Sequence, residues 1–181
     1  MGFRYEVRFS GAGGQGLILI GKILAEAVAL YDNKNATQSQ SYGPEARGGA
    51  SKSEVIISDE EIDYPKATRI DFLLALTQKA CDKYSHSLKK GGILLVDSRF
   101  VKDVPQGPFK IYRAPIIDTA EKEIGNRVVA NIVALGIFAK LSGVVSKEAI
   151  EKAVLSRVPK GTEKLNLRAL SAGVEIAKGL S

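Results

Sequence analysis

A glycine-rich turn near the start of the chain constrains the fold most strongly. Residues 4–10 alternate between polar and apolar side chains, the glycine turn Gly11–Gly16 follows, and an apolar run continues to Tyr31. This order predicts a strand, a tight turn and a helix, and three of the glycines have the G-x-G-x-x-G spacing of phosphate-binding turns. Glycine allows a ligand to approach the backbone, and a helix N-terminus offers free N–H groups. The turn is therefore a candidate anion site; the alternative is that its glycines only permit a tight turn and close helix packing.

Segments typical of strands alternate with segments typical of helices along the rest of the chain. This alternation predicts a Rossmann-like α/β sandwich around a mainly parallel sheet, in a single domain over residues 1–181. The strands are expected near Arg4–Ser10, Ala36–Gln40, Ser53–Ser58, Asp71–Thr77, Gly92–Asp97 and Lys110–Arg113. The helices are expected near Gly16–Tyr31, Gln78–Leu88, Ile116–Ile124, Arg127–Leu141, Lys147–Ser156 and Glu163–Lys178.

Two of the predicted strands carry unusually many polar side chains. The first alternates strictly, and the second, Ala36–Gln40, is polar almost throughout. Central parallel strands are usually continuous apolar runs, because helices cover both of their faces. We therefore expect part of the sheet to have one face open to water or covered by another protein chain. On the first strand this would be the face of Arg4, Glu6, Arg8 and Ser10.

The composition excludes several classes of site. The formal net charge of +6 comes from scattered Lys and Arg residues, which disfavours nucleic-acid binding and leaves a basic surface for acidic partners. Cys81 is the only cysteine and His86 the only histidine. A four-thiolate iron–sulfur cluster, a structural zinc site or an internal disulfide cannot be built from this chain alone. With no leader or membrane segment evident, we expect a cytoplasmic protein, with Cys81 as a small helix residue and His86 solvated.

A second glycine-bearing loop is predicted between two strands, over residues 40–51. It contains Arg47, whose guanidinium has the planar donor geometry that suits a carboxylate or a phosphate. Gly48 and Gly49 follow it and would let the backbone approach a ligand or a neighbouring chain closely. The alternative interpretation is a surface loop without a ligand.

Three further polar residues bear on function. A dinucleotide site needs an acidic residue at the end of the second strand, but Asp32 precedes that strand, which argues against NAD or FAD. Asn131 interrupts an apolar helix and must find partners for its amide, either any nearby backbone group or a loop near the site. Asp97 ends a buried strand, where it could line a cleft or cap a turn.

The two glycine-bearing loops together resemble a known family. The segments Ser10–Gly16, Gln40–Gly49 and Ser53–Ser58 closely resemble the gamma subunit of 2-oxoacid:ferredoxin oxidoreductases, and Ala130–Gly136 is similar to that family's asparagine-bearing helix. The resemblance covers nearly the whole chain. It implies one subunit of a complex that converts a 2-oxoacid and coenzyme A (CoA) to acyl-CoA and CO2, with ferredoxin as acceptor. It also implies that thiamine diphosphate and the iron–sulfur clusters are bound by other subunits, not by this chain.

The resemblance implies a supporting role for this chain, with no catalytic residue of its own. It would assist assembly and CoA access, and the 2-oxoglutarate version of the family is the most similar, ahead of versions for pyruvate and other oxoacids. Two alternatives remain: a stand-alone Rossmann-type nucleotide-binding oxidoreductase, and a non-catalytic scaffold. The implied contact residues are Gly11, Gly13, Gln15, Gly16, Ser41, Arg47, Gly48 and Gly49.

Overall fold

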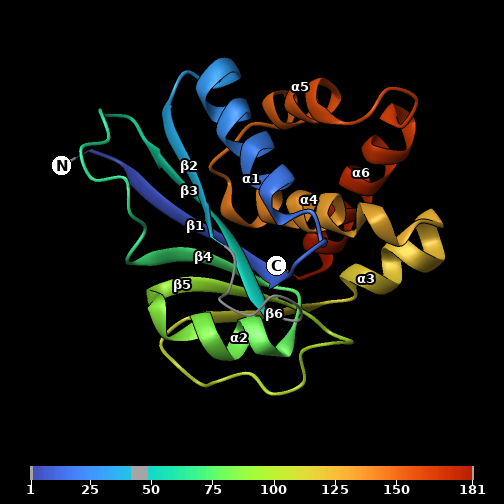
Figure 1. Cartoon of the computed structure of the whole chain (residues 1–181), viewed down its shortest axis with the longest axis horizontal. Coiled ribbons are helices and arrows are strands. Elements are labelled where there is room, and N and C mark those ends of the chain that lie inside the picture. Colours follow the sequence, from blue (N-terminus) through green and yellow to red (C-terminus); the bar gives the residue numbers. More distant parts are fainter. Residues whose placement is uncertain (1, 42–48, 181) are drawn as a thin grey trace.

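The computed structural model describes residues 2–41 and 49–180, and it contains a six-stranded sheet with helices on both faces (Figure 1). The spatial order of the strands is β2-β3-β1-β4-β5-β6. Strands β1, β4, β5 and β6 run parallel to one another, whereas β3 is antiparallel to both of its neighbours. The predicted α/β class with a mainly parallel sheet is therefore confirmed. The strands are β1 (Arg4–Ala12), β2 (Asn35–Ser41), β3 (Ala50–Ser58), β4 (Ile70–Ala75), β5 (Leu88–Asp97) and β6 (Lys110–Ala114).

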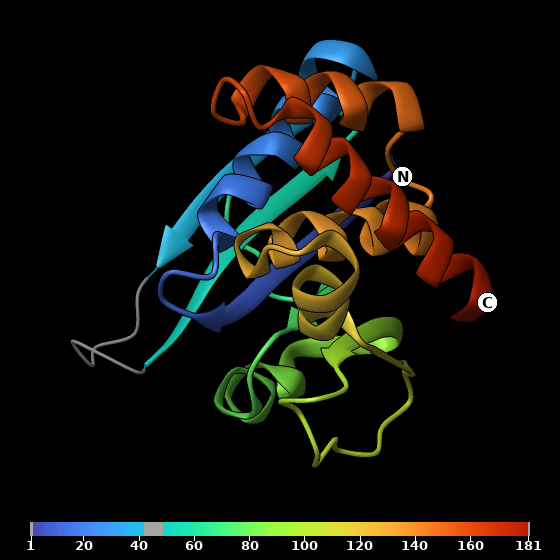
Figure 2. The same cartoon turned by 90° about the vertical axis from the view of Figure 1, so that its right-hand side faces the viewer.

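The helices form two layers of unequal thickness. Figures 1 and 2 show α1, α4, α5 and α6 on one side of the sheet and α2 on the other. The α-helices are α1 (Leu17–Glu26), α2 (Gln78–Tyr84), α3 (Ile116–Asp118), α4 (Ala130–Ser142), α5 (Lys147–Arg157) and α6 (Glu163–Leu180). Shorter helical segments extend them: π-helical turns at Ala27–Tyr31 and Thr119–Ile124, and 3₁₀ turns at Ser85–Ser87 and Arg127–Val129.

The larger core lies between the sheet and the thicker helical layer. Phe138 of α4 meets Phe9 of β1 and Phe72 of β4 edge to face, with ring centroids 5.4 and 4.8 Å apart. All three rings are fully buried, and so is almost the whole of α4 up to Phe138. This burial makes α4 a fixed support for the loops at its ends.

The polar face of the first strand, expected to be open to water or covered by another chain, is exposed at Arg4 but buried within this chain at Glu6, Arg8 and Ser10. Arg8 is 6% exposed, and its guanidinium donates to Glu54 Oε2 at 2.8 and 2.6 Å and lies 5.2 Å from the centre of the Tyr84 ring. Ser10 is fully buried and donates to the Leu74 carbonyl at 2.7 Å. The chain's own thin layer around α2 covers this face, and the buried polar groups find partners both in that layer, at Ser87, and on the neighbouring strands, at Glu54 and Leu74. The two edge strands, β2 and β6, remain partly open to solvent.

Two glycines behave differently from the sequence-based expectation. The strand expected near Gly92–Asp97 begins earlier, because β5 starts at Leu88, and Gly91 takes a φ of 81° within it. The register between β4 and β5 shifts at this place, which is typical of a glycine in a strand. The last helix, expected near Glu163–Lys178, continues through Gly179 to Leu180.

Candidate binding cleft at the glycine turn

The glycine turn is tighter than the motif suggests, because β1 extends through Gly11 to Ala12. Gly14 and Gly16 adopt φ values of 84° and 74°, a region in which other residues are strained. A Cβ on Gly13 would meet nothing within 4 Å, so this position is open toward the surroundings. The conformation of the turn therefore requires glycine at two positions, and the open position leaves its backbone accessible.

Gln15 braces the turn from within. Its side-chain Oε1 accepts a hydrogen bond from the Ala12 N–H at 2.7 Å, and it occupies the space that a Cβ on Gly11 would need. A larger residue at position 11 would therefore displace the end of the Gln15 side chain and crowd the Cβ of Leu76. The side chain of Gln15 folds back onto its own loop, which gives this predicted contact residue a structural role in the chain as it stands.

Asn131 holds the turn from the opposite side. Its amide is 4% exposed, and Nδ2 donates to the Gly16 carbonyl at 3.1 Å while Oδ1 accepts from the Ile132 N–H at 2.9 Å. A Cβ on Gly16 would collide with this side chain. Asn131 therefore ties the backbone of the predicted glycine turn to α4.

A cleft of about 230 Å³ opens beside the braced turn, at the carboxyl ends of the parallel strands. The turn after β1 leads to α1 on one face of the sheet, and β4 leads to α2 on the other face. Adjacent parallel strands that continue to opposite faces leave a crevice between their loops, which is where open α/β sheets bind ligands. Six residues besides Gln15 line it: Gly14, Leu76, Ile117, Arg127, Val128 and Ala130.

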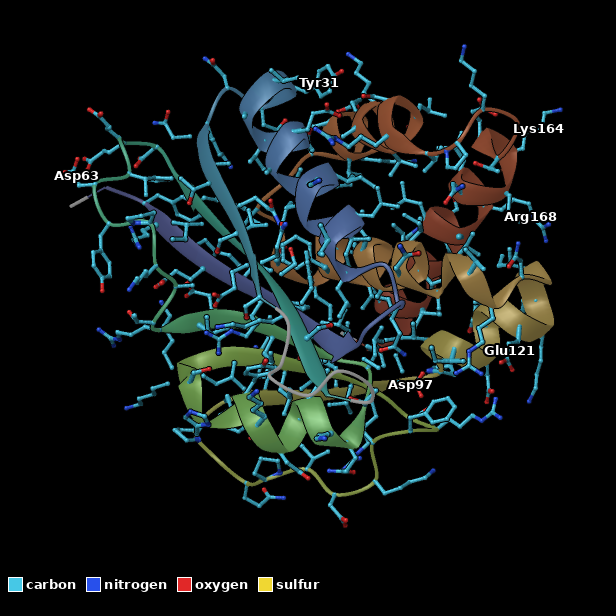
Figure 3. All side chains as sticks on the ribbon, in the orientation of Figure 1. Tyr31, Asp63, Asp97, Glu121, Lys164 and Arg168 are labelled. Atoms are coloured by element: carbon cyan, nitrogen blue, oxygen red, sulfur yellow. The ribbon has the colours of Figure 1, made fainter. Side chains whose placement is uncertain are left out.

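The rim of this cleft combines arginines with exposed apolar side chains. Arg127 donates to Glu121 at 3.1 Å and lies 5.3 Å from the centre of the Phe100 ring. The Arg99 guanidinium lies 4.9 Å from the centre of the same ring. Its hydrogen bonds to Asp118 and Glu121 raise its pKa. Val128 is 79% exposed. Figure 3 shows Glu121 on this side of the molecule.

Sequence reasoning missed this rim, because it placed Val128 inside a helix expected near Arg127–Leu141. The helix begins only at Ala130, and the preceding 3₁₀ turn rotates Val128 outward. Asn126 caps that turn by accepting the Val128 N–H at 3.0 Å. The only available signal was this asparagine, two residues ahead of an apolar run.

Asp97 shapes the wall of the cleft and does not line it. Its carboxylate is fully buried and accepts three backbone N–H groups, from Arg99 and Phe100 at 3.0 Å and from Ile117 at 2.9 Å. Of its two predicted roles, turn capping is therefore the one that the structure shows. Figure 3 places this residue at the same end of the sheet as the cleft.

The second predicted loop begins and ends at this same end of the sheet. Because β3 is antiparallel to β1, its first residue Ala50 pairs with Ala12, and Lys52 pairs with Ser41 at the end of β2. Ser41 is exposed and Gly49 is partly buried beside them. Arg47 and Gly48 lie outside the described residues. The register thus brings the described parts of both predicted loops to the same end of the sheet.

The structure also bears on the sites that the sequence disfavoured. Asp32 accepts hydrogen bonds from the Ser146 N–H at 2.7 Å and from its hydroxyl at 2.6 Å, so its carboxylate is engaged in capping α5. Burial raises the pKa of Cys81 to about 11, which keeps the thiol neutral. His86 is exposed, as expected.

Two wider searches of residues 2–41 and 49–180 bear on the class of protein. They contain no cluster of three or more His, Cys, Asp or Glu side chains arranged to hold a metal ion. None of their helices is long and apolar enough to span a membrane.

Comparisons with known proteins identify the family. The family model described as pyruvate ferredoxin/flavodoxin oxidoreductase matches residues 6–176. The 2-oxoglutarate synthase subunit KorC of Methanocaldococcus jannaschii is 55% identical over 98% of this chain and 96% of its own length. A keto/oxoacid ferredoxin oxidoreductase gamma subunit from Geobacter sulfurreducens is 60% identical, with a TM-score of 0.92 and 98% of each chain covered. The chain therefore belongs to the pyruvate ferredoxin/flavodoxin oxidoreductase family.

Proposed function

We propose that this chain is the gamma subunit of a 2-oxoglutarate:ferredoxin oxidoreductase in the cytoplasm, with residues 1–181 as its single gamma-type domain. The observation that carries the proposal is the 55% identity to a 2-oxoglutarate synthase subunit across almost the entire length of both chains. The complex would cleave the bond between C1 and C2 of 2-oxoglutarate. It would release CO2, form succinyl-CoA from CoA, and pass two electrons to ferredoxin.

The redox chemistry of this reaction would be supplied by thiamine diphosphate and iron–sulfur clusters in partner subunits. Cys81 is the chain's only cysteine, and it is buried and neutral, so it does not fit the ligand set of a cluster. The residues of this chain would instead help to assemble the complex and to admit CoA. A single cysteine, which cannot form a disulfide within the chain, also fits a reducing compartment.

The cleft supports the part of the proposal that concerns CoA. The open backbone around Gly13 could meet a phosphate, and the walls formed by Leu76 and Ile117 suit an uncharged chain. Ser41 and Gly49 lie at the same edge of the sheet. Arg47 lies between them in sequence and would contribute a guanidinium to the phosphates of CoA.

Co-expression with the neighbouring open reading frames tests the assignment. The chain should co-purify with larger chains that bind thiamine diphosphate and iron–sulfur clusters. The complex should reduce ferredoxin with 2-oxoglutarate and CoA, and less efficiently with pyruvate or 2-oxoisovalerate. A complex of full activity that lacks this chain would contradict the assignment, and a preference for pyruvate would contradict the substrate.

The CoA role has a separate test in the intact complex. Arg47→Ala should raise the KM for CoA at least fivefold, because one charge-assisted contact is lost, while the KM for 2-oxoglutarate stays unchanged. Lys164→Ala, on the exposed outer side of α6, is the matched control. An unchanged KM for CoA would favour the scaffold alternative. Calorimetry with NAD(P) and FAD tests the stand-alone alternative, and we expect no binding because Asp32 is already engaged.

A further inference from the structure

A second cavity, of about 410 Å³, lies among α4, α5 and α6, at the end of α4 opposite the glycine turn. Its size falls within the usual range of small-molecule sites. Ile150 and Leu170 form a floor that is almost completely buried, and Val145 and Val174 extend it toward the opening. The cavity therefore offers a compact apolar surface that no side chain of the described residues fills.

The crossing of α4 and α6 explains why this space is open. Gly136 and Gly173 meet at the crossing, where a Cβ on either would collide with the backbone of the other helix. Beyond this close contact α4 continues through Ala139 and ends at Ser142, and the next residue, Gly143, has a φ of 66°. Ala139 and Gly143 are too small to fill the space between α4 and the start of α5. The cavity is thus a product of helix geometry and small side chains.

The rim of the cavity carries a surplus of lysines. Lys178 forms an ion pair with Glu175 at 2.8 Å, and together with the charge of Lys147 it lowers the pKa of that carboxyl group. Lys140 and Lys147 also line the opening, and in the described part of the chain neither forms an ion pair. Glu151 is the only other acidic side chain on the lining. The mouth of an apolar cavity is therefore positively charged.

The geometry points to a binding site for an organic anion with a compact apolar body, such as an aryl or branched-alkyl carboxylate or sulfonate. The apolar body would cover Ile150 and Leu170, and the acid group would lie between Lys140 and Lys147 at the mouth. Apolar area supplies most of the affinity in such a pocket, and a few charged groups fix the orientation. The inference concerns a surface separate from the glycine turn and does not depend on the proposed function.

A pair of matched probes tests the two halves of this inference on the full chain. 8-Anilinonaphthalene-1-sulfonate is an aromatic anion, and N-phenyl-1-naphthylamine is the same molecule without the sulfonate. Fluorescence titration should show one saturable site for the anion and at least fivefold weaker binding of the neutral probe. Equal affinities would overturn the assignment of an anion site, and absence of saturable binding of either probe would overturn the site itself.

Variants locate the probe on the molecule. Lys140→Gln/Lys147→Gln should weaken binding of the anionic probe at least fivefold and leave the neutral probe unaffected. Lys160→Gln/Lys164→Gln makes the same change of net charge outside the cavity, in the exposed turn before α6 and in its first turn, and should change the binding of neither probe. Val174→Trp should block both probes, with circular dichroism to verify folding. Equal weakening by the two double variants would show diffuse charge attraction and would overturn the proposal.

Discussion

The close crossing of α4 and α6 makes a prediction whose sign depends on the structure. Gly173→Ala replaces a helical glycine by the best helix former, which alone would stabilise the chain by about 1 kcal/mol. At this position, however, the new Cβ collides with the Val133 carbonyl and lies only 3.0 Å from the Gly136 Cα and the Ile137 nitrogen. These are backbone atoms, so no side chain can rotate away. The two helices must separate by on the order of 1 Å.

Overpacking of this kind typically costs about 1–3 kcal/mol, and the collision with backbone places this variant at the upper end. After the gain in helix propensity, we expect a net loss of about 2 kcal/mol in the free energy of unfolding. Urea titration followed by circular dichroism measures it, because the midpoint falls while the slope stays constant. Gly179→Ala on the same helix is the control, since a Cβ there meets nothing within 4 Å, and it should be neutral or stabilising. A Gly173→Ala chain as stable as this control would refute the crossing geometry.

Three further predictions concern buried polar groups. Asn131→Ala removes the hydrogen bond to the Gly16 carbonyl and should lower the free energy of unfolding by about 1–2 kcal/mol. The same urea titration measures this loss, and an unchanged midpoint would contradict a bracing role. Arg8→Met leaves the buried Glu54 carboxylate with Lys52, at 3.2 Å, as its one ion-pair partner among the described residues. We therefore expect the free energy of unfolding to fall by about 3 kcal/mol, and to fall less in the double variant with Glu54→Gln. Burial raises the pKa of Cys81 to about 11, so little of the thiol is ionised at pH 8. Cys81 should therefore react with Ellman's reagent about two orders of magnitude more slowly in the folded chain than in the urea-unfolded chain. Equal rates would show an ionised, accessible thiol and contradict this prediction.

The sequence was sufficient to predict where strands and helices occur, because periodicity and glycine positions are local signals. All six predicted strands and all six predicted helices exist. The serine just before α5 is one such local signal, because the Ser146 hydroxyl caps the helix by accepting the Ala149 N–H at 3.1 Å. The exposure of the polar face of β1 was not predictable in the same way. Whether Arg8 meets water or Glu54 depends on the strand pairing of β1 with β3, and that contact joins residues far apart in the chain.

In the candidate site, too, the residues with a local sequence signal could be predicted and those that depend on long-range contacts could not. The strand-turn-helix signal located the glycine turn, and the asparagine in an apolar helix indicated its brace. Arg127 and Phe100 could not be found, because their contact depends on how the loops after β5 and β6 meet across the end of the sheet. The positions of Ser41 and Gly49 beside the turn required the antiparallel register of β3, which no local pattern encodes.

The two edges of the sheet have different consequences for self-association of the isolated chain. Edge strand β2 carries no charged side chain and no proline over its length, whereas edge strand β6 contains Lys110 and Arg113. Charges and prolines protect a sheet edge against pairing with another chain. Of the two edge strands, β2 lacks this protection and β6 has it. Two copies that joined through β2 would leave only charged edges at both ends, so such growth stops at a pair and does not lead to a filament.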